Sequence, residues 1–401
     1  MKDILVVADI YPFPYNTGGK LRTANLIIQL SKYYNVDFVC FSLDSIELKQ
    51  IEQAKEYCRN VFVHESVMPS KIKKIVNLFS KSCNAEFIVN SNEMKQTVRE
   101  LTHKYSYKAV VVERLYAYQY VKDVVKAPIL LDMHDIEREA MDYFSKIAKN
   151  PLQKLHYKIE THKVIQLEKA AVSHVAKMIT VSERDKEIYL QYFSKTREKW
   201  FSVNNGIDLS KALDTPVTRR DDRTVIFVGS LRHPPNMHGL RWFVTNAWPS
   251  IVKKYSDARF VIVGSGEISD EDKTLFASTT GVEFKGFVAN LYPLLRKATC
   301  LVVPLFSGSG TRLKILEAFS FQLPVVSTTV GAEGLPYTNG RDIIIENEAD
   351  GMKDGISRIF DDKEYAESLA DAAYGLVAID YNWDEIGKKL VREIEKLGVQ
   401  S

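Results

Sequence analysis

Residues 300–328 read CLVVPLFSGSGTRLKILEAFSFQLPVVST and indicate the fold more clearly than any other segment. Two short apolar runs, 300–305 and 323–328, flank a segment with a helical pattern. Strands joined through a helix are typical of the βαβ unit, whose strands run parallel and are covered on both faces. These residues therefore predict part of an open parallel α/β sheet.

The same alternation continues in both directions along the chain. Short β-rich apolar runs recur throughout, and segments of helical pattern lie between them. The expected strands are 3–9, 36–42, 108–114, 128–134, 177–183, 224–230, 258–265, 282–287, 300–305, 323–328 and 342–346. Two consecutive series of this kind predict an α/β protein with two doubly wound, Rossmann-like domains.

A change in composition marks the domain boundary. Residues 200–222 contain Gly, Pro, Asp and Asn without a sustained hydrophobic period, which is typical of a linker. We therefore expect an N-terminal domain over 1–200 and a C-terminal domain over 201–380. The last segment, 381–401, has apolar residues at helical spacing and is expected to be a helix.

Composition narrows the class of protein. The chain has 401 residues, of which 45% are hydrophobic and 26% charged, and these values exclude a disordered or fibrous protein. Four scattered cysteines without metal-ligand spacing favour a reducing, cytoplasmic location. We expect no signal peptide and no membrane-spanning segment.

Charge is distributed unevenly between the two halves. Residues 1–200 carry 31 Lys and Arg against 24 Asp and Glu, whereas residues 201–401 carry 23 against 27. The basic half either meets an anionic partner or differs by chance. Within it, 70–81 (SKIKKIVNLFSK) reads as a basic amphipathic helix. That helix either lies on an anionic membrane or packs on the N-terminal core. We expect no nucleic acid partner, because the basic residues lack interleaved aromatics and a known module.

Two loops of the first half carry candidate site residues, since ligands bind parallel sheets at the carboxyl ends of the strands. Gly18 and Gly19 precede a helical run that starts near Lys20, so they either admit an anion to the helix N-terminus or form an ordinary turn. His134 ends an apolar strand between Asp132 and Asp135. It either orients a hydroxyl and stabilises developing charge, or it is a packed, hydrogen-bonded strand-end histidine.

The strongest candidate site lies inside the opening stretch. The loop residues Gly308, Ser309 and Gly310 leave backbone amides uncovered before a helix expected to begin near Thr311. Arg312 and Lys314 suit a phosphate, and Glu317 is placed to accept hydroxyls from a sugar or ribose. Together these residues predict a diphosphate site that needs no metal. The run VGSGEIS (263–269) lacks the third glycine of a dinucleotide fingerprint and is a weak signal.

At these residues the chain resembles a known family. GTRLKILEAFSFQLPVVSTTVGAEGL is similar to the donor-site signature of GT4-type (group 1) glycosyltransferases, which have the GT-B fold. Further matching motifs follow in the family's order along nearly the whole chain. They are the GG loop at 18–19, HD at 134–135, TVSERD at 180–185, NNGID at 204–208, VGSL at 228–231, VIVGSGE at 261–267, VEFKGFV at 282–288 and YNWDEI at 381–386.

The resemblance also shows departures from the family pattern. Glu317 matches the second Glu of the family's E-x7-E motif, which usually holds the donor ribose, but position 309 is Ser309 instead of the first Glu. Ser230 stands where the family has an arginine, and RHPPN (232–236) stands where it has a lysine. We hypothesise that Arg312 and Lys314 replace these missing cations.

The resemblance implies a fold and an activity. It implies two Rossmann-like domains that face each other across a cleft, with a last helix that crosses back to the N-terminal domain. The implied activity is a retaining, metal-independent hexosyl transfer from a nucleotide sugar, most often a UDP-sugar. The implied acceptor is a saccharide or a lipid-linked sugar, bound by the N-terminal domain, in cell-surface polysaccharide assembly. The enzyme would be cytoplasmic or peripheral on the inner face of the membrane.

The resemblance also assigns roles to residues. His134, Arg312 and Lys314 would act on the reacting groups. Donor contacts would come from Gly18, Gly19, Ser230, Ser309, Gly310, Thr311 and Glu317, with the nucleobase near Val288. Two alternatives stay open, namely an inactive glycosyltransferase-like accessory subunit, which Ser230 and Ser309 would suit, and a non-hydrolysing nucleotide-sugar epimerase.

Overall fold

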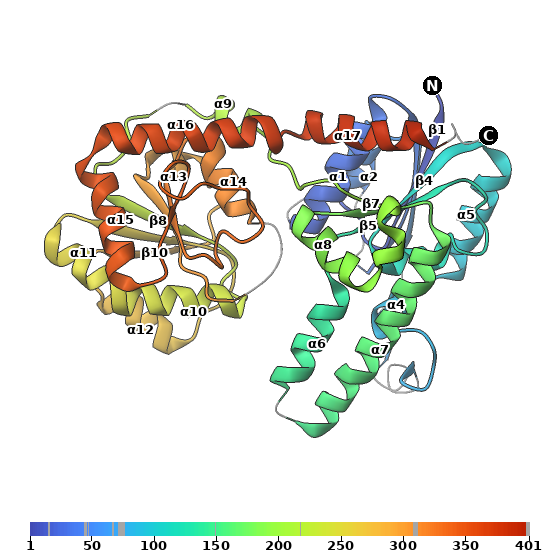
Figure 1. The fold of residues 1–401 in the computed structure, drawn as a ribbon, viewed down its shortest axis with the longest axis horizontal. Helices are drawn as coiled ribbons and strands as arrows, with labels where there is room; N and C mark the ends of the chain where they lie inside the picture. The colour runs from blue at the N-terminus through green and yellow to red at the C-terminus, as the bar shows by residue number, and fades with distance from the viewer. Residues whose placement is uncertain are drawn as a thin grey trace. The chain divides into compact units, whose positions relative to one another are not determined.

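A computed structural model shows two compact units, Met1–Asn204 with Ile386–Ser401 (unit 1) and Asn205–Glu385 (unit 2) (Figure 1). Each unit is built on a parallel sheet, which confirms the prediction of two Rossmann-like α/β domains. The structure describes residues 1–14, 17–43, 46, 48–65, 68–70, 77–148, 150–216, 218–307 and 312–397.

Unit 1 contains a sheet of seven strands in the order β3-β2-β1-β4-β5-β6-β7. Its central strand β1 is apolar and buried, and it pairs in parallel with β2 and β4. The strands are β1 Asp3–Ala8, β2 Asn35–Ser42, β3 Asn60–Glu65, β4 Tyr107–Glu113, β5 Ile129–Met133, β6 Lys177–Thr180 and β7 Trp200–Ser202. The helices are α1 Gly18–Ser31, α2 Leu48–Lys55, α4 Asn84–Ile88, α5 Asn92–Lys104, η1 Leu115–Tyr120, α6 Glu137–Ile147, α7 Pro151–His174, α8 Glu183–Tyr192 and η2 Ser194–Lys199.

Helix α17 (Trp383–Lys396) closes the chain, and its residues from Ile386 onward belong to unit 1. Ile386, Leu390 and Ile394 are buried on one face of it. The carboxylate of Glu395 accepts hydrogen bonds from Lys2 and Tyr34, each at 2.8 Å. Helix α17 is therefore joined to the N-terminal residues of unit 1.

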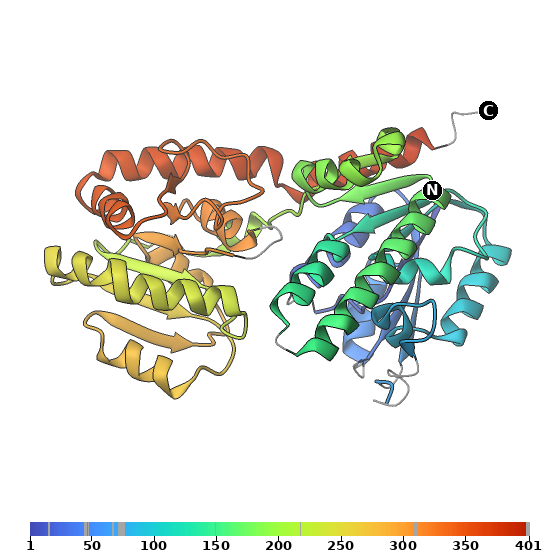
Figure 2. The same cartoon turned by 60° about the horizontal axis from the view of Figure 1, so that its bottom comes forward.

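Unit 2 contains a sheet of six strands in the order β10-β9-β8-β11-β12-β13. Along β8, Val225 and Phe227 join one buried cluster and Ile226 joins another, so both faces of the sheet are covered (Figure 2). The strands are β8 Thr224–Val228, β9 Arg259–Val263, β10 Val282–Gly286, β11 Cys300–Val303, β12 Val325–Ser327 and β13 Ile344–Ile345. The helices are α9 Ser210–Asp214, α10 Pro234–Trp242, η3 Phe243–Ala247, α11 Trp248–Lys254, α12 Asp270–Ser278, α13 Tyr292–Lys297, α14 Leu313–Ser320, α15 Ala349–Asp361 and α16 Lys363–Asp380.

Two helix starts differ from the sequence prediction. Helix α1 begins at Gly18 after the N-cap Thr17, so the glycine pair lies inside the first turn and not before it. Helix α14 begins at Leu313 with Arg312 as its N-cap, later than the start expected near Thr311. In both places helical dihedrals begin at a residue that composition alone does not distinguish from its neighbours.

Candidate functional site

The amine of Lys314 lies against the turn that follows β8 in unit 2. Its Nζ donates to Asn236 Oδ1 at 3.1 Å and lies 4.6 Å from the centre of the Phe227 ring. A Cβ atom added to Gly229 would sit 2.8 Å from Nζ, so only glycine lets the amine come this close without a shift. Asn236 in turn donates from Nδ2 to the Ser230 carbonyl at 2.8 Å. The turn, the asparagine and the lysine form one connected polar site.

Lys314 and Arg312 both bring positive charge to this site. Among the described residues Lys314 has no carboxylate partner. Burial, and then the charge of Arg312, lowers the pKa of Lys314 to about 7. Burial and the same two cations also lower the pKa of His233. An anion placed here would relieve that repulsion and raise the pKa of the lysine again.

Glu317 lies one helical turn after Lys314 on α14, and its carboxylate makes no hydrogen bond or ion pair within the described part of the chain. Burial raises its pKa to about 7. A carboxylate without a partner is available to accept hydroxyl groups from a ligand. Lys314 and Glu317 therefore offer an anion contact and a hydroxyl contact on the same helix.

Arg312 has a structural contact of its own. Its side chain is 7% exposed, Nη2 donates to the Val330 carbonyl at 2.9 Å, and the same nitrogen lies 4.0 Å from Glu333 Oε2. The guanidinium thus holds the turn after β12 while it adds positive charge beside Lys314.

In unit 1 the polar groups at the strand ends are paired. Arg22, on α1, donates from Nε and Nη2 to the two carboxylate oxygens of Asp132 at 2.6 and 2.8 Å. Its Nη1 also donates to the Val203 carbonyl at 2.7 Å. Thr23, the next residue of α1, donates from Oγ1 to Glu113 Oε2 at 3.0 Å. Helix α1 is therefore joined to the ends of β4, β5 and β7.

His134 completes this network. Its Nε2 lies 3.0 Å from Glu113 Oε2 and 3.5 Å from Asp132 Oδ2, and its side chain is 7% exposed. Burial alone would lower the pKa of His134, but the bonds to Asp132 and Glu113 raise it to about 9. The imidazole is therefore protonated at neutral pH and donates toward both carboxylates.

The second ring nitrogen of His134 faces the first turn of α1. Nδ1 is buried and has no hydrogen-bond partner among the residues that the structure describes. A Cβ atom on Gly19 would lie 3.6 Å from it, and both Gly18 and Gly19 are exposed. The protonated Nδ1–H and the helix N-terminus thus present donors and positive charge at the same place.

Unit 2 is similar to a known protein family. Residues 222–362 match the family model of the glycosyl transferases group 1. This part of the chain is therefore similar to the group 1 glycosyltransferases.

Two relatives and one solved structure extend this result. The chain is 24% identical over 359 residues to an uncharacterized 44.6 kDa protein in the cps region of Klebsiella pneumoniae, covering 87% of this chain and 88% of that one. It is 26% identical over 200 residues to the Escherichia coli UDP-Gal:alpha-D-GlcNAc-diphosphoundecaprenol alpha-1,3-galactosyltransferase, covering 46% of this chain and 49% of that one. The structure of Anabaena Alr3699/HepE with UDP and glucose superposes with a TM-score of 0.65 at 12% identity over 98% of this chain and 99% of that chain. The chain therefore has a GT-B fold.

The residues predicted for the glycosyltransferase site separate into two groups. Unit 1 brings His134 to Gly19, and unit 2 brings Lys314 to the Gly229–Ser230 turn with Arg312 nearby. The Ser230 residue is exposed, and Val288 packs against the core just after β10. Three predicted contacts lie outside the described residues, and they are Ser309, Gly310 and Thr311.

The cluster of Glu113, Asp132 and His134 contains residue types that bind metals, but cations already occupy its carboxylates. Glu113, Asp132 and His134 each place one possible ligand atom within 4.8 Å of the others. However, both oxygens of Asp132 already accept from the guanidinium of Arg22, and His134 is protonated. A metal ion would have to displace one cation and deprotonate the other.

Sequence reasoning missed the residues that hold His134 in place. Arg22 on α1 and Glu113 at the end of β4 are both buried, and the polar residues around Arg22 on α1 leave it undistinguished in the sequence. Arg114, which follows Glu113, has φ of 75°, a conformation rare for a residue with a side chain. Its Nη1 donates to Asp9 Oδ1 at 3.3 Å and its amide donates to the Asp132 carbonyl at 3.0 Å.

Proposed function

We propose that this protein is a retaining, metal-independent hexosyltransferase that moves a sugar from a UDP-sugar to a saccharide or lipid-linked acceptor. The observation that carries the proposal is the buried amine of Lys314, which has no carboxylate partner in the described chain. A buried cation without a counter-ion costs free energy, and a donor diphosphate would offset that cost. Nearby Glu317 would accept ribose hydroxyls.

The choice of donor rests on the relatives. The Anabaena structure contains UDP, and the Escherichia coli relative is named for UDP-Gal. These names favour a uracil nucleotide for the present chain.

The proposed chemistry uses the positive charge around Lys314 in unit 2. As the bond from the anomeric carbon to the diphosphate oxygen breaks, negative charge grows on the leaving group, and Lys314 and Arg312 stabilise it. The acceptor oxygen attacks the anomeric carbon from the face that the phosphate leaves, so the anomeric configuration is retained. The proton of the acceptor hydroxyl passes to the departing phosphate oxygen. In unit 1, His134, held protonated by Asp132 and Glu113, would donate from Nδ1 to a sugar oxygen.

The acceptor class rests on the same kind of evidence. The Klebsiella relative is encoded in a cps region, and the Escherichia coli relative is named for a sugar linked to diphosphoundecaprenol. We propose that the present protein extends a saccharide chain in cell-surface polysaccharide assembly.

Nucleotide binding tests the donor site. UDP would be titrated calorimetrically in the presence of a chelator, with GDP and ADP as comparison ligands. We expect selective UDP binding in the wild type and at least tenfold weaker binding in Lys314→Met and in Glu317→Ala. Lys273→Met is the matched control, since Lys273 is exposed on α12. Failure of the wild type to bind any of the three nucleotides would contradict the proposal.

Turnover tests the reaction class. Hydrolysis or transfer from a panel of UDP-sugars would be followed by NMR at the anomeric proton. The proposal expects a product with the donor's anomeric configuration without added metal. UDP binding without turnover on any donor and acceptor would favour the accessory-subunit alternative.

A further inference from the structure

Helices α6 and α7 of unit 1 form a hairpin that projects from the body of that unit (Figures 1 and 2). Four large apolar side chains are exposed near its tip. Leu152 is 76% exposed and Leu155 56% on α7, and Tyr143 is 52% exposed and Phe144 41% on α6. Side chains of this size rarely gather on a surface that faces only water.

Aromatic contacts keep this surface continuous across the two helices. The Phe144 and Tyr157 rings lie 5.6 Å apart between α6 and α7, and Tyr143 and Phe144 lie 6.0 Å apart on α6. The exposed side chains are therefore presented by a packed pair of helices.

The tip is also basic. Lys146, Lys154 and Lys158 are exposed there, and α7 has no acidic residue in its first turn. Between residues 141 and 158 the only acidic residue is Asp142, which pairs with Lys146 at 2.7 Å. Lysines thus surround the apolar side chains without enough acids to neutralise them.

A second exposed apolar group lies beside the same hairpin. Lys163 of α7 donates to the carbonyls of Asn77 and Ser82 at 2.8 and 3.2 Å and so anchors the loop between them. In that loop Phe79 is 91% exposed. It belongs to the segment 70–81 that the sequence predicts as a membrane-binding or core-packing helix, of which residues 71–76 lie outside the described chain.

We propose that the tip of the α6–α7 hairpin binds the headgroup region of an anionic lipid bilayer. Leucine and aromatic side chains would enter the boundary between headgroups and acyl chains, and the lysines would contact lipid phosphates. Protein interfaces enrich aromatics but deplete lysine, so the mixture found here fits a lipid surface better than a protein partner. No helix in the described ranges has the length and apolar character to cross a membrane, so this contact is interfacial.

Vesicle co-sedimentation of the full chain tests this proposal. Vesicles of phosphatidylcholine and phosphatidylglycerol in equal parts would be compared with vesicles of phosphatidylcholine alone. We expect binding only to the anionic vesicles, and weaker binding at high salt. Leu152→Ser/Leu155→Ser and Lys154→Gln/Lys158→Gln should each reduce binding at least tenfold.

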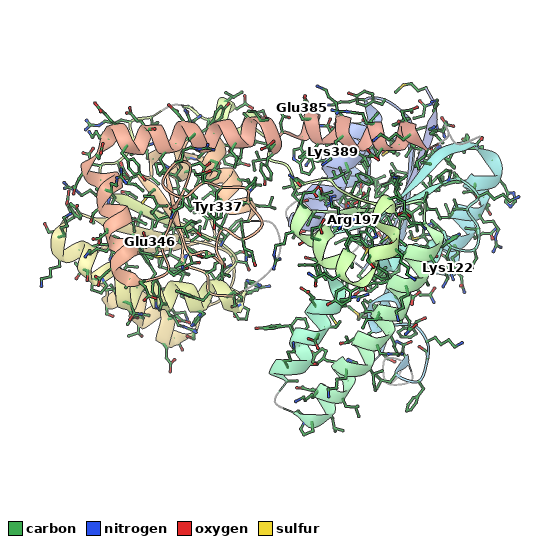
Figure 3. All side chains as sticks on the ribbon, viewed as in Figure 1. Lys122, Arg197, Tyr337, Glu346, Glu385 and Lys389 are labelled. Atoms are coloured by element: carbon green, nitrogen blue, oxygen red, sulfur yellow. The ribbon has the colours of Figure 1, made fainter. Side chains whose placement is uncertain are left out.

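Matched control variants test whether the loss of vesicle binding is specific to the hairpin. Leu48→Ser/Leu213→Ser removes two leucines that are 80% and 74% exposed elsewhere. Lys122→Gln/Lys273→Gln removes two exposed lysines, of which Lys122 lies on the body of unit 1, away from the tip (Figure 3). Both controls should bind vesicles as the wild type does.

Two results would overturn the proposal. One is anionic-vesicle binding that is absent in the wild type or unchanged in both tip variants. The other is a wild-type dimer that dissociates in Leu152→Ser/Leu155→Ser without any vesicle binding, since a second copy would then cover the tip. The circular dichroism spectrum and melting temperature of each variant report whether its fold is intact, and vesicle binding requires neither UDP nor sugar transfer. Failure here therefore leaves the proposed reaction standing, and the reverse also holds.

Discussion

The two units bury cations in opposite ways. In unit 1, Arg22 and His134 are matched by Asp132 and Glu113, and the pKa of His134 rises to about 9. In unit 2, Lys314 has no carboxylate partner in the described chain, and its pKa falls to about 7. The partner, and not the burial, decides the direction of the shift. A paired site has its final charge before a ligand arrives, whereas an unpaired site acquires it with the ligand.

The largest expected contrast is in folding stability. Arg22→Met leaves the buried Asp132 carboxylate without its bidentate partner and should lower the free energy of unfolding by about 3–5 kcal/mol. Lys314→Met removes a buried charge without a carboxylate partner and should leave that free energy unchanged or higher. Urea denaturation of both variants would measure the difference, and equal losses would show that the two sites are not distinct in this respect.

For activity, we expect the larger loss in Lys314→Met, the variant that keeps its folding stability. If Lys314 stabilises the leaving diphosphate, Lys314→Met lowers kcat/KM by about 10²–10³-fold, as for the loss of one oxyanion donor. Initial rates with the preferred UDP-sugar would measure this. Lys353→Met, on α15, serves as the control and should keep wild-type kinetics.

Folding stability should depend on pH with opposite signs for His134 and Lys314. The pKa of His134 is about 9 in the folded chain and 6.5 in a model peptide, so its stabilising contribution is full below pH 6.5 and is lost as the pH rises through 9. Lys314, with a folded pKa of about 7 against 10.5, makes stability rise with pH over that interval. Unfolding curves from pH 7.5 to 8.5 in the Lys314→Met background, above the pKa of Glu317 and below that of an unfolded thiol, should therefore show the decline. Glu113→Gln in that background should make the decline shallower, since one of the two carboxylates that raise the pKa of His134 is lost.

Ligand binding should change the protonation of only one site. Near pH 8 the Lys314 amine is largely neutral without ligand, and a bound diphosphate raises its pKa. UDP binding should therefore take up a proton. Calorimetry in buffers of different ionisation enthalpy would detect that uptake, and Lys314→Met should abolish it. An uptake that persists in this variant would assign the proton elsewhere.

The smallest effect is expected at the turn itself. In Gly229→Ala the new methyl would lie 2.8 Å from Lys314 Nζ and 2.9 Å from Asn236 Nδ2. Both groups end flexible side chains and can move by a few tenths of an ångström, so we expect UDP affinity to fall by about tenfold or less. Gly340→Ala probes a glycine with no neighbour within 4 Å and φ of 79°. It should leave UDP affinity unchanged, and any cost should be in stability.

The fold was largely predictable because the strands are valine-rich runs that are buried on both faces, as in β1 and β11. Lys314 and Glu317 could be singled out because the strand, the glycine-rich loop and the helix start are contiguous in sequence. Arg22 and Glu113 could not, because their partners lie far along the chain. The Arg22–Asp132 pair spans 110 residues and the Thr23–Glu113 bond spans 90. Such pairs depend on strand order, which hydrophobic periodicity does not specify.

The place of α17 in unit 1 has a consequence for synthesis on the ribosome. Unit 2 is continuous, but unit 1 needs residues from Ile386 onward, including Ile394 and Glu395, which binds Lys2 and Tyr34. The nascent N-terminal unit therefore stays without α17 until residues 386–396 have been made, by which time all of unit 2 exists. Its uncovered apolar surface must wait for this helix, so premature termination near residue 385 would release a complete second unit joined to an incomplete first one.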